Sequence, residues 1–112
     1  MNTKADLPVA PIAVVIPCYR VGRLVLDVIA RIGGEVGWIF VVDDKCPVDT
    51  GDIVEAQCTD PRVRVIRHEE NQGVGGATVT GYKAAMASLA KVVVKIDGDG
   101  QMDPALIPQL SR

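Results

Sequence analysis

The feature that most constrains this sequence is the alternation of short aliphatic runs with segments of helical spacing. Four runs are rich in the β-branched side chains that strands favour: Ile12–Ile16, Trp38–Val42, Arg62–Ile66 and Val92–Ile96. After the first run, apolar residues recur at the spacing of one helix face, at positions 21, 24, 25, 28, 29 and 32. Strands that alternate with helices form βαβ units, which predict a parallel sheet with helices on both faces.

Three later segments also have helical character. A weak helix is predicted from Asp52 to Gln57, and a longer one follows the glycine-rich segment Gly73 to Gly76. The longer helix has four residues on one side, where Met86 is expected to pack: Tyr82, Ala85, Met86 and Leu89. A last helix is predicted to begin at Asp103-Pro104, because Asp is a favourable N-cap and Pro a favourable first helical residue.

Composition limits the class of protein. The chain has 112 residues, 48% of them hydrophobic and only 4% aromatic, which suits one domain with an aliphatic core. Its net charge of -2 argues against nucleic-acid partners, which need a concentrated basic face. The three cysteines lack the spacing of a zinc site or a disulfide framework, so a cytoplasmic location is expected. Prolines 11 and 17 interrupt the longest apolar stretch, which is too short for a membrane helix.

Ligands of parallel sheets bind beyond the carboxyl ends of the strands, and acidic residues gather there. Asp97 and Asp99 follow the fourth run, and their spacing in extended backbone would place both carboxylates on one ion. Carboxylates together with substrate phosphates are the ligands that Mg²⁺ prefers, and Mn²⁺ shares this ligand class. The pair therefore fits a metal-bridged diphosphate, and the alternative is a solvated polar turn.

Asp43 and Asp44 end the second run and, as neighbours in a strand, are expected to point to opposite sides. One carboxylate could accept a hydrogen bond from a nucleobase imide or a ribose hydroxyl. The alternative is a turn in which an Asp side chain caps the strand.

Two other features are weaker. The segment Gly73 to Thr78 fits neither the dinucleotide fingerprint nor the P-loop, so its glycines are expected to let a helix start close to the sheet. His68 is the only histidine, which excludes a triad or cluster built on several histidines, and it is expected to be a surface or loop residue.

Four motifs follow one another along the chain: Val14-Val-Ile-Pro-Cys-Tyr19, Val41-Val-Asp-Asp44, Asn71-x-Gly73 with Gly76-Ala77 and Gly81, and Asp97-Gly-Asp-Gly-Gln101 with Asp103-Pro104. Their residues and order resemble the amino-terminal half of family 2 glycosyltransferases, enzymes of the GT-A fold that use nucleotide sugars. The resemblance covers residues 11 to 110. It implies a Rossmann-like α/β domain with strand order 3-2-1-4.

The same resemblance implies roles for residues at the strand ends. Pro17 and Tyr19 would lie beside the base or ribose of the nucleotide. An acid at the end of the second strand, Asp43 or Asp44, would recognise the base. The donor would be a nucleotide diphosphate sugar, carrying UDP or GDP.

For the D-x-D motif, the resemblance implies a divalent cation, Mg²⁺ or Mn²⁺. Asp99 would be its principal ligand, Asp97 would contact the metal or the ribose, and Gln101 would contact the substrate. The form of this motif is similar to the branch that acts on polyprenyl phosphates, such as the dolichyl-phosphate mannosyltransferases. A metal on the diphosphate would neutralise charge on the departing nucleotide.

Two departures from the family pattern affect these expectations. The loop after Asp44 reads Lys45-Cys46-Pro47 where the family commonly has Gly-Ser or Asn-Ser, which would alter base recognition. Residues 1–10 form an N-terminal extension, and residues 11–112 correspond to the nucleotide-sugar-binding part without the acceptor-binding half. The general base is therefore expected outside this chain, the chain alone is expected to be inactive, and membrane contact would come through segments outside it.

An exposed aliphatic edge on the fourth strand would also favour pairing with a second copy. Two alternatives to an enzyme domain stay open. The first is a non-catalytic nucleotide-binding or assembly module. The second is a Rossmann dinucleotide protein, which the absence of the first-turn glycines disfavours.

Overall fold

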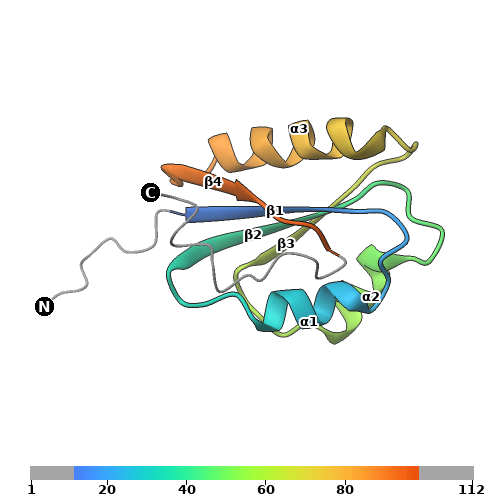
Figure 1. Ribbon diagram of the computed structural model, residues 1–112, viewed down its shortest axis with the longest axis horizontal. Coiled ribbons are helices and arrows are strands. Elements are labelled where there is room, and N and C mark those ends of the chain that lie inside the picture. The colour runs from blue at the N-terminus through green and yellow to red at the C-terminus, as the bar shows by residue number, and fades with distance from the viewer. Residues whose placement is uncertain (1–11, 99–112) are drawn as a thin grey trace, which may run out of the picture.

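The computed structural model describes residues 12–98, which form a parallel sheet with helices on both faces (Figure 1). The sheet has the order β3-β2-β1-β4, as predicted, and all three strand pairs are parallel. Its strands are β1 (Ile12–Cys18), β2 (Val36–Asp43), β3 (Val63–Arg67) and β4 (Val92–Lys95). The helix predicted at Asp103 lies outside the described residues.

The helices divide between the two faces of the sheet. Helices α1 (Leu24–Ala30) and α2 (Thr50–Gln57) lie on one face, and α3 (Gly73–Met86) crosses the other, as Figure 1 shows. Every residue of β1 is buried, because this central strand is covered by helices on both sides. The core is therefore two aliphatic clusters separated by the sheet, the larger under α1 and α2 and the smaller under α3.

Helix α3 differs from the sequence prediction in its start and in its buried face. It begins at Gly73 itself, so the glycine-rich segment forms its first turns. Small residues face the sheet, namely Ala77, Gly81 and Ala85. The bulkier residues predicted to share a side with Ala85 are exposed, with Tyr82 at 40%, Met86 at 75% and Leu89 at 84% of their full exposure.

Close approach to β1 explains this reversal. A Cβ added at Gly81 would overlap Cγ1 of Val15 and lie 3.1 Å from its Cγ2. Only small side chains fit where the helix backbone lies this close to a strand. The glycines at the start of the helix, Gly73, Gly75 and Gly76, were expected to allow this approach, but an added Cβ at any of them would meet no atom of the sheet. The close approach is instead at Gly81, and the predicted packing of Met86 is also wrong.

Strand register brings the candidate site residues to one edge. Cys18 of β1 is level with Asp43 of β2, which is level with Arg67 of β3. Val15 is paired with Lys95 of β4, so Asp97 follows close to the level of Pro17. The residues just beyond the strands consequently lie together at the edge of the sheet where the strands have their carboxyl ends.

Arg62 ties the opposite edge of the sheet together. Its guanidinium donates to the carbonyl oxygens of Ile32 (3.0 Å), Gly33 (2.6 Å) and Val36 (3.0 Å), which form the turn from α1 to β2. Asp60 accepts from the same guanidinium at 2.8 Å. The start of β3 is thereby fixed to the start of β2.

Within residues 12–98, no helix has the length and apolar character needed to cross a bilayer.

Candidate functional site

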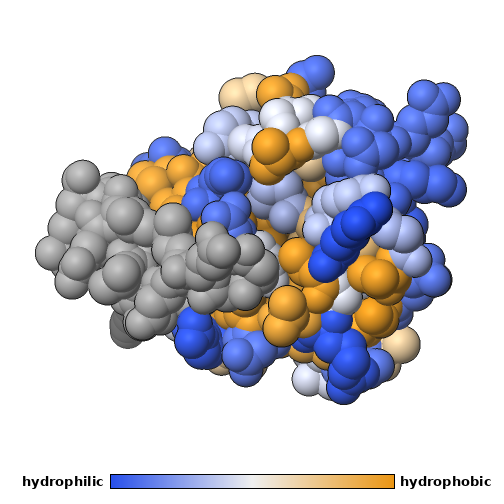
Figure 2. Space-filling view, turned by 45° about the vertical axis from the view of Figure 1, so that its right-hand side comes forward, coloured by the Kyte–Doolittle hydropathy of each residue, from blue (hydrophilic) through white to orange (hydrophobic). Residues whose placement is uncertain are grey.

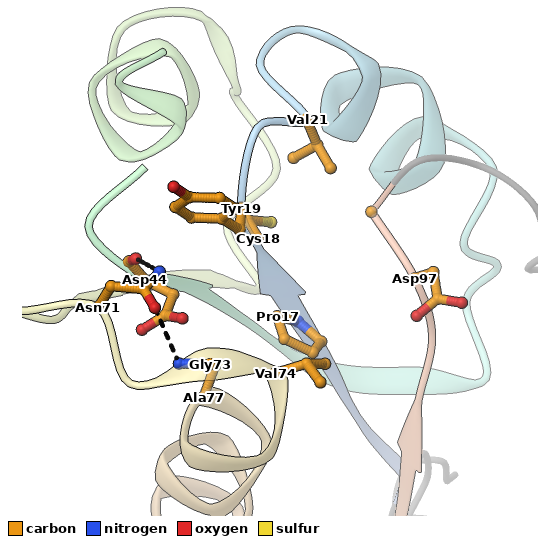
Figure 3. Close-up of a pocket in the computed structure, with 11 residues that line it drawn as sticks. Pro17, Cys18, Tyr19, Val21, Asp44, Asn71, Gly73, Val74, Ala77 and Asp97 are labelled. Carbon is orange, nitrogen blue, oxygen red and sulfur yellow. Dashed lines mark hydrogen bonds between the residues drawn. The ribbon is translucent and has the colours of Figure 1, made fainter. Parts of the chain in front are cut away.

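A pocket of about 370 Å³ opens beyond the carboxyl ends of β1, β2 and β4, where α3 begins. It is lined by residues of β1 and α3 and of the segments next to the four elements: Pro17, Cys18, Tyr19, Val21, Asp44, Asn71, Gly73, Val74, Ala77, Asp97 and Gly98. Figure 3 shows Asp44 and Asn71 on one wall and Asp97 across from them, with Pro17 between. Hydrophobic and hydrophilic residues are interleaved on this side of the molecule (Figure 2). Such a mixture of apolar walls and a few polar groups is typical of small-molecule sites.

The structure brings Pro17 and Tyr19 into the wall of this pocket. Tyr19 keeps 45% of its exposure, and the guanidinium carbon of Arg20 lies 5.3 Å from the centre of its ring. Arg20 has a φ of 62°, an uncommon backbone conformation for a residue other than glycine. Its backbone N–H donates to Cys46 Sγ at 2.9 Å, which holds this turn against the loop after β2.

Asp43 and Asp44 point to opposite faces of the sheet, as strand alternation predicts. Asp43 accepts hydrogen bonds from the backbone N–H groups of Cys46 and Gly51, both at 2.7 Å. Arg67 lies 3.8 Å from the same carboxylate. These contacts anchor the loop into α2, so Asp43 has the capping role that the sequence left open, and it is not among the residues that line the pocket.

Asp44 is the acid that faces the pocket. Its Oδ1 accepts from the backbone N–H of Gln72 at 2.8 Å and lies 2.7 Å from His68 Nδ1. Its Oδ2 is buried and has no hydrogen-bond partner among residues 12–98. A buried acceptor without a partner is destabilising by about 1–3 kcal/mol, which makes this oxygen a candidate acceptor for a ligand.

His68 lies in the loop directly after β3, in agreement with the expected surface or loop position. Its side chain is not at the surface, however, because it is only 7% exposed and lies between Asp44 and Thr80. Its Nε2 is 2.8 Å from Thr80 Oγ1. The sequence did hold an indication, because His68 directly follows β3 and this strand pairs with the one that Asp44 follows.

Asn71 joins the end of β2 to the start of α3. Its Nδ2 donates to the carbonyl oxygen of Asp44 at 3.0 Å, and its Oδ1 accepts from the N–H of Gly73 at 3.2 Å, as drawn in Figure 3. Gly73 has a φ of 81°, which glycine adopts readily and other residues rarely do. The Asn71-x-Gly73 motif therefore fixes the position of α3 relative to Asp44.

Asp97 lies on the other side of the pocket, with its side chain 46% exposed and 3.4 Å from Lys95 Nζ. The next residue, Gly98, leaves no spare room, because an added Cβ would be 3.2 Å from Cys18 Sγ. Asp99 and Gln101, the other predicted members of this motif, lie outside the described residues. Between residues 12 and 98, the structure contains no group of three or more potential metal-binding side chains.

The loop that departs from the family pattern is well connected. Cys46 Sγ lies 3.1 Å from Thr50 Oγ1 and accepts from Arg20 N–H. Burial acts to raise the pKa of Cys46, but hydrogen bonds from Thr50 and from backbone groups outweigh it and lower the pKa below the usual value. Burial instead raises the pKa of Cys18 far above the usual range, and the negative charge of Asp43 adds to this rise.

The parallel sheet, its strand order and a pocket beyond the strand ends define a Rossmann-like α/β domain. Residues 13–112 match the family model described as glycosyl transferase family 2. The chain belongs to this family of glycosyltransferases.

Relatives with similar sequences carry more specific names. An undecaprenyl-phosphate mannosyltransferase of Micrococcus luteus is 34% identical over 73 residues, which are 64% of this chain and 30% of that protein. A UDP-N-acetylglucosamine–dolichyl-phosphate N-acetylglucosaminyltransferase of Methanococcus voltae is 31% identical, over 83% of this chain and 43% of its own. A dolichol-phosphate mannosyltransferase of Pyrococcus furiosus is 30% identical over a match that covers 88% of this chain and 28% of that protein. The chain thus spans less than half the length of these relatives.

Proposed function

We propose that this chain is the donor-binding part of a glycosyltransferase that moves a sugar from a nucleotide diphosphate sugar to a polyprenyl phosphate. The observation that carries the donor site is the buried, unpartnered Oδ2 of Asp44 beside a pocket at the strand ends. The names of the three relatives, each of which refers to undecaprenyl, dolichyl or dolichol phosphate, support the class of acceptor.

In this proposal the nucleoside occupies the pocket. Asp44 Oδ2 accepts a hydrogen bond from a ring N–H of the base, which removes the unfavourable burial of a free acceptor. The ring of Tyr19 and the side chain of Pro17 supply apolar surface for the base or ribose. Asp43 takes no direct part, since its oxygens are used by the loop into α2.

The metal site of this proposal combines Asp97 with Asp99. The donor chemistry of Asp97 fits a hard cation, because its half-exposed carboxylate lies at the pocket and its contact with Lys95 is a long one of 3.4 Å. Bound Mg²⁺ or Mn²⁺ would neutralise charge on the departing diphosphate. Gln101 is proposed to contact the substrate from the same segment.

Transfer breaks the bond between the sugar C1 and the donor diphosphate, which leaves with the electron pair, and forms a bond between C1 and an acceptor phosphate oxygen. A phosphate oxygen is already anionic, so this acceptor needs less help from a general base than a hydroxyl does. We propose that residues 11–112 supply donor binding, that residues 1–10 are an extension, and that acceptor binding requires further chain.

Calorimetric titration of the 112-residue chain tests the donor site. UDP, GDP and NAD are each added with and without Mn²⁺, to the parent and to Asp97→Asn. Asp27→Asn is the matched control, because Asp27 is an exposed acid on α1, away from the residues that line the pocket. We expect metal-dependent binding of a nucleoside diphosphate that Asp97→Asn weakens and Asp27→Asn leaves unchanged. Metal-independent binding of NAD alone would refute the proposal.

The alternative of a non-catalytic nucleotide-binding module gives the same binding results. Transfer of a labelled sugar to a polyprenyl phosphate by a protein of the relatives' full length, carrying this domain, separates the two. Transfer that Asp97→Asn abolishes supports the enzyme, whereas donor binding without transfer to any polyprenyl phosphate supports the module.

We also propose that the chain self-associates through β4. This strand ends the sheet and pairs only with β1 among the described residues. An open edge of valines is a template for a second strand. Sedimentation should therefore show dimers whose β4 amides are protected from hydrogen exchange, and a monomer with freely exchanging β4 amides would contradict the proposal.

A further inference from the structure

The side chain of His68 is held from both ends by two different elements. Its Nδ1 lies 2.7 Å from Asp44 Oδ1, just after β2, and its Nε2 lies 2.8 Å from Thr80 Oγ1 on α3. Its backbone N–H also donates to the carbonyl oxygen of Asp43 at 2.9 Å. The side chain is only 7% exposed, so these contacts and the surrounding atoms hold the imidazole in place.

The partners also determine where the protons lie. An ionised carboxylate only accepts hydrogen bonds, so His68 Nδ1 carries a proton and donates it to Asp44 Oδ1. In the neutral ring Nε2 is then an acceptor, which the hydroxyl of Thr80 can satisfy. Of the three hydrogen-bonded residues Asp44, His68 and Thr80, only Asp44 lines the pocket, so His68 and Thr80 contact it from outside the pocket.

The contact with His68 helps to fix the orientation of the Asp44 carboxylate. Its Oδ1 receives two donors, the imidazole Nδ1–H and the N–H of Gln72, whereas its Oδ2 receives none among the described residues. The carboxylate is therefore fixed with one oxygen satisfied by the protein and one left for a ligand. Rotation of the carboxylate to offer both oxygens would break both of these hydrogen bonds.

We propose that His68 is a positioning residue that makes Asp44 present a single acceptor to the nucleobase, which selects uracil over guanine. This inference rests on the function proposed above. Uracil has one ring N–H, flanked by two carbonyl groups, so it needs one acceptor. Guanine offers two adjacent donors, N1–H and the N2 amino group, which a carboxylate meets best with both oxygens.

The distribution of negative charge on the Asp44 carboxylate also favours uracil over guanine. In a uracil complex, the carbonyl oxygen beside the ring N–H approaches the second carboxylate oxygen. Two donors already share the negative charge of that oxygen, which reduces the repulsion. Without the imidazole the carboxylate would be freer to turn, and the site would lose its advantage for a base with one donor.

The test measures UDP and GDP binding to the 112-residue chain by calorimetry in the presence of Mn²⁺. The variants are His68→Ala, His68→Asn and Thr80→Val. For the parent we expect tighter binding of UDP than of GDP. His68→Ala should weaken UDP binding by about tenfold, because Asp44 is no longer held in the orientation that UDP requires, and should change GDP binding much less, so that the ratio of the two affinities falls.

His68→Asn is the conservative variant, because its amide N–H₂ can take the place of Nδ1–H toward Asp44. It should restore most of the preference for UDP. Thr80→Val keeps the shape of Thr80 but removes the partner of Nε2, and should lower the ratio in the same direction by a smaller factor. If His68→Ala fails to fold, as thermal unfolding would show, these two variants still test the proposal.

Three results would overturn it. Equal losses of UDP and GDP affinity in the variants would make His68 a structural residue only. Tighter binding of GDP than of UDP by the parent would refute the selection of uracil. A preference for UDP that survives in both His68→Ala and Thr80→Val would show that another group sets it. Failure of the parent to bind either nucleotide would instead refute the function proposed above.

Discussion

Replacing Gly81 by alanine provides the sharpest test of how α3 packs on the sheet. The added methyl group would overlap Val15 Cγ1 and lie 3.1 Å from Cγ2 and 3.2 Å from Cβ, well inside the 3.5–4.0 Å at which carbon atoms attract. Val15 is fully buried in β1 and cannot turn away. Helix α3 must then move outward, which loosens the contacts of Ala77 and Ala85 one turn away on either side.

The magnitude follows from two opposing effects. Overpacking costs about 1–3 kcal/mol, and the overlap with a buried valine places this case in the upper part of that range, at about 2–3 kcal/mol, whereas the higher helix propensity of alanine returns about 1 kcal/mol. We expect a net loss of about 1–2 kcal/mol, or roughly 5–15 °C in Tm for a domain of this size. Gly75→Ala is the matched control, because Gly75 lies in the same helix with nothing within 4 Å of the added Cβ, and it should gain about 0.5 kcal/mol.

Thermal and urea unfolding, followed by far-UV circular dichroism, measure both variants. The two substitutions add the same methyl group to the same helix, so opposite signs isolate the contact with Val15. A Gly81→Ala protein as stable as the parent, or more stable, would refute the close packing of α3 on β1.

Other predictions concern the rest of the fold. Arg62→Ala should lower the free energy of unfolding by about 2–4 kcal/mol in urea titrations, because several charge-assisted hydrogen bonds to backbone carbonyls are lost. The hydrogen bond from Arg62 lowers the pKa of Asp60, so this carboxylate stabilises the fold above its ordinary pKa of 3.8 and the contribution disappears as the pH falls below it. Asp60→Asn should flatten that acid limb of the stability curve; an unchanged limb would contradict the assignment. Alkylation of folded protein, mapped by mass spectrometry over a pH series, should modify Cys46 at lower pH than Cys18, given the opposite shifts of their pKa values. Asp43→Ala should destabilise by about 2–3 kcal/mol, since two buried N–H groups lose their acceptor.

The sheet was predictable because its strands are short β-branched runs with helices between them, and this pattern admits few topologies. The face of α3 that packs on the sheet was not predictable in this way. Periodicity finds apolar residues that share a side, but it does not say whether a helix packs with its large residues or with glycine and alanine. At α3 the backbone approaches Val15 so closely that the small residues are inside and Met86 is outside.

For the site, the rule that ligands bind at strand ends placed Pro17, Tyr19, Asp44 and Asp97 in one pocket. The rule could not decide which of Asp43 and Asp44 faces the pocket, because that depends on which of the two carboxylates the loop into α2 binds. The contacts that bury His68 could not be predicted for a related reason. Its partners are 24 and 12 residues away, and their proximity arises only when β3 and α3 are in place.

The two neighbouring aspartates at the end of β2 have consequences for how such a domain can change. Asp43 accepts hydrogen bonds from the protein's own backbone, whereas Asp44, the next residue, keeps one oxygen available for the proposed ligand. Position 44 can therefore vary to accept new partners while position 43 preserves the scaffold. An insertion or deletion of one residue in β2 would exchange the two positions and disrupt both tasks together. Diversification at this point of the chain is thus expected to proceed by substitution and not by changes in length.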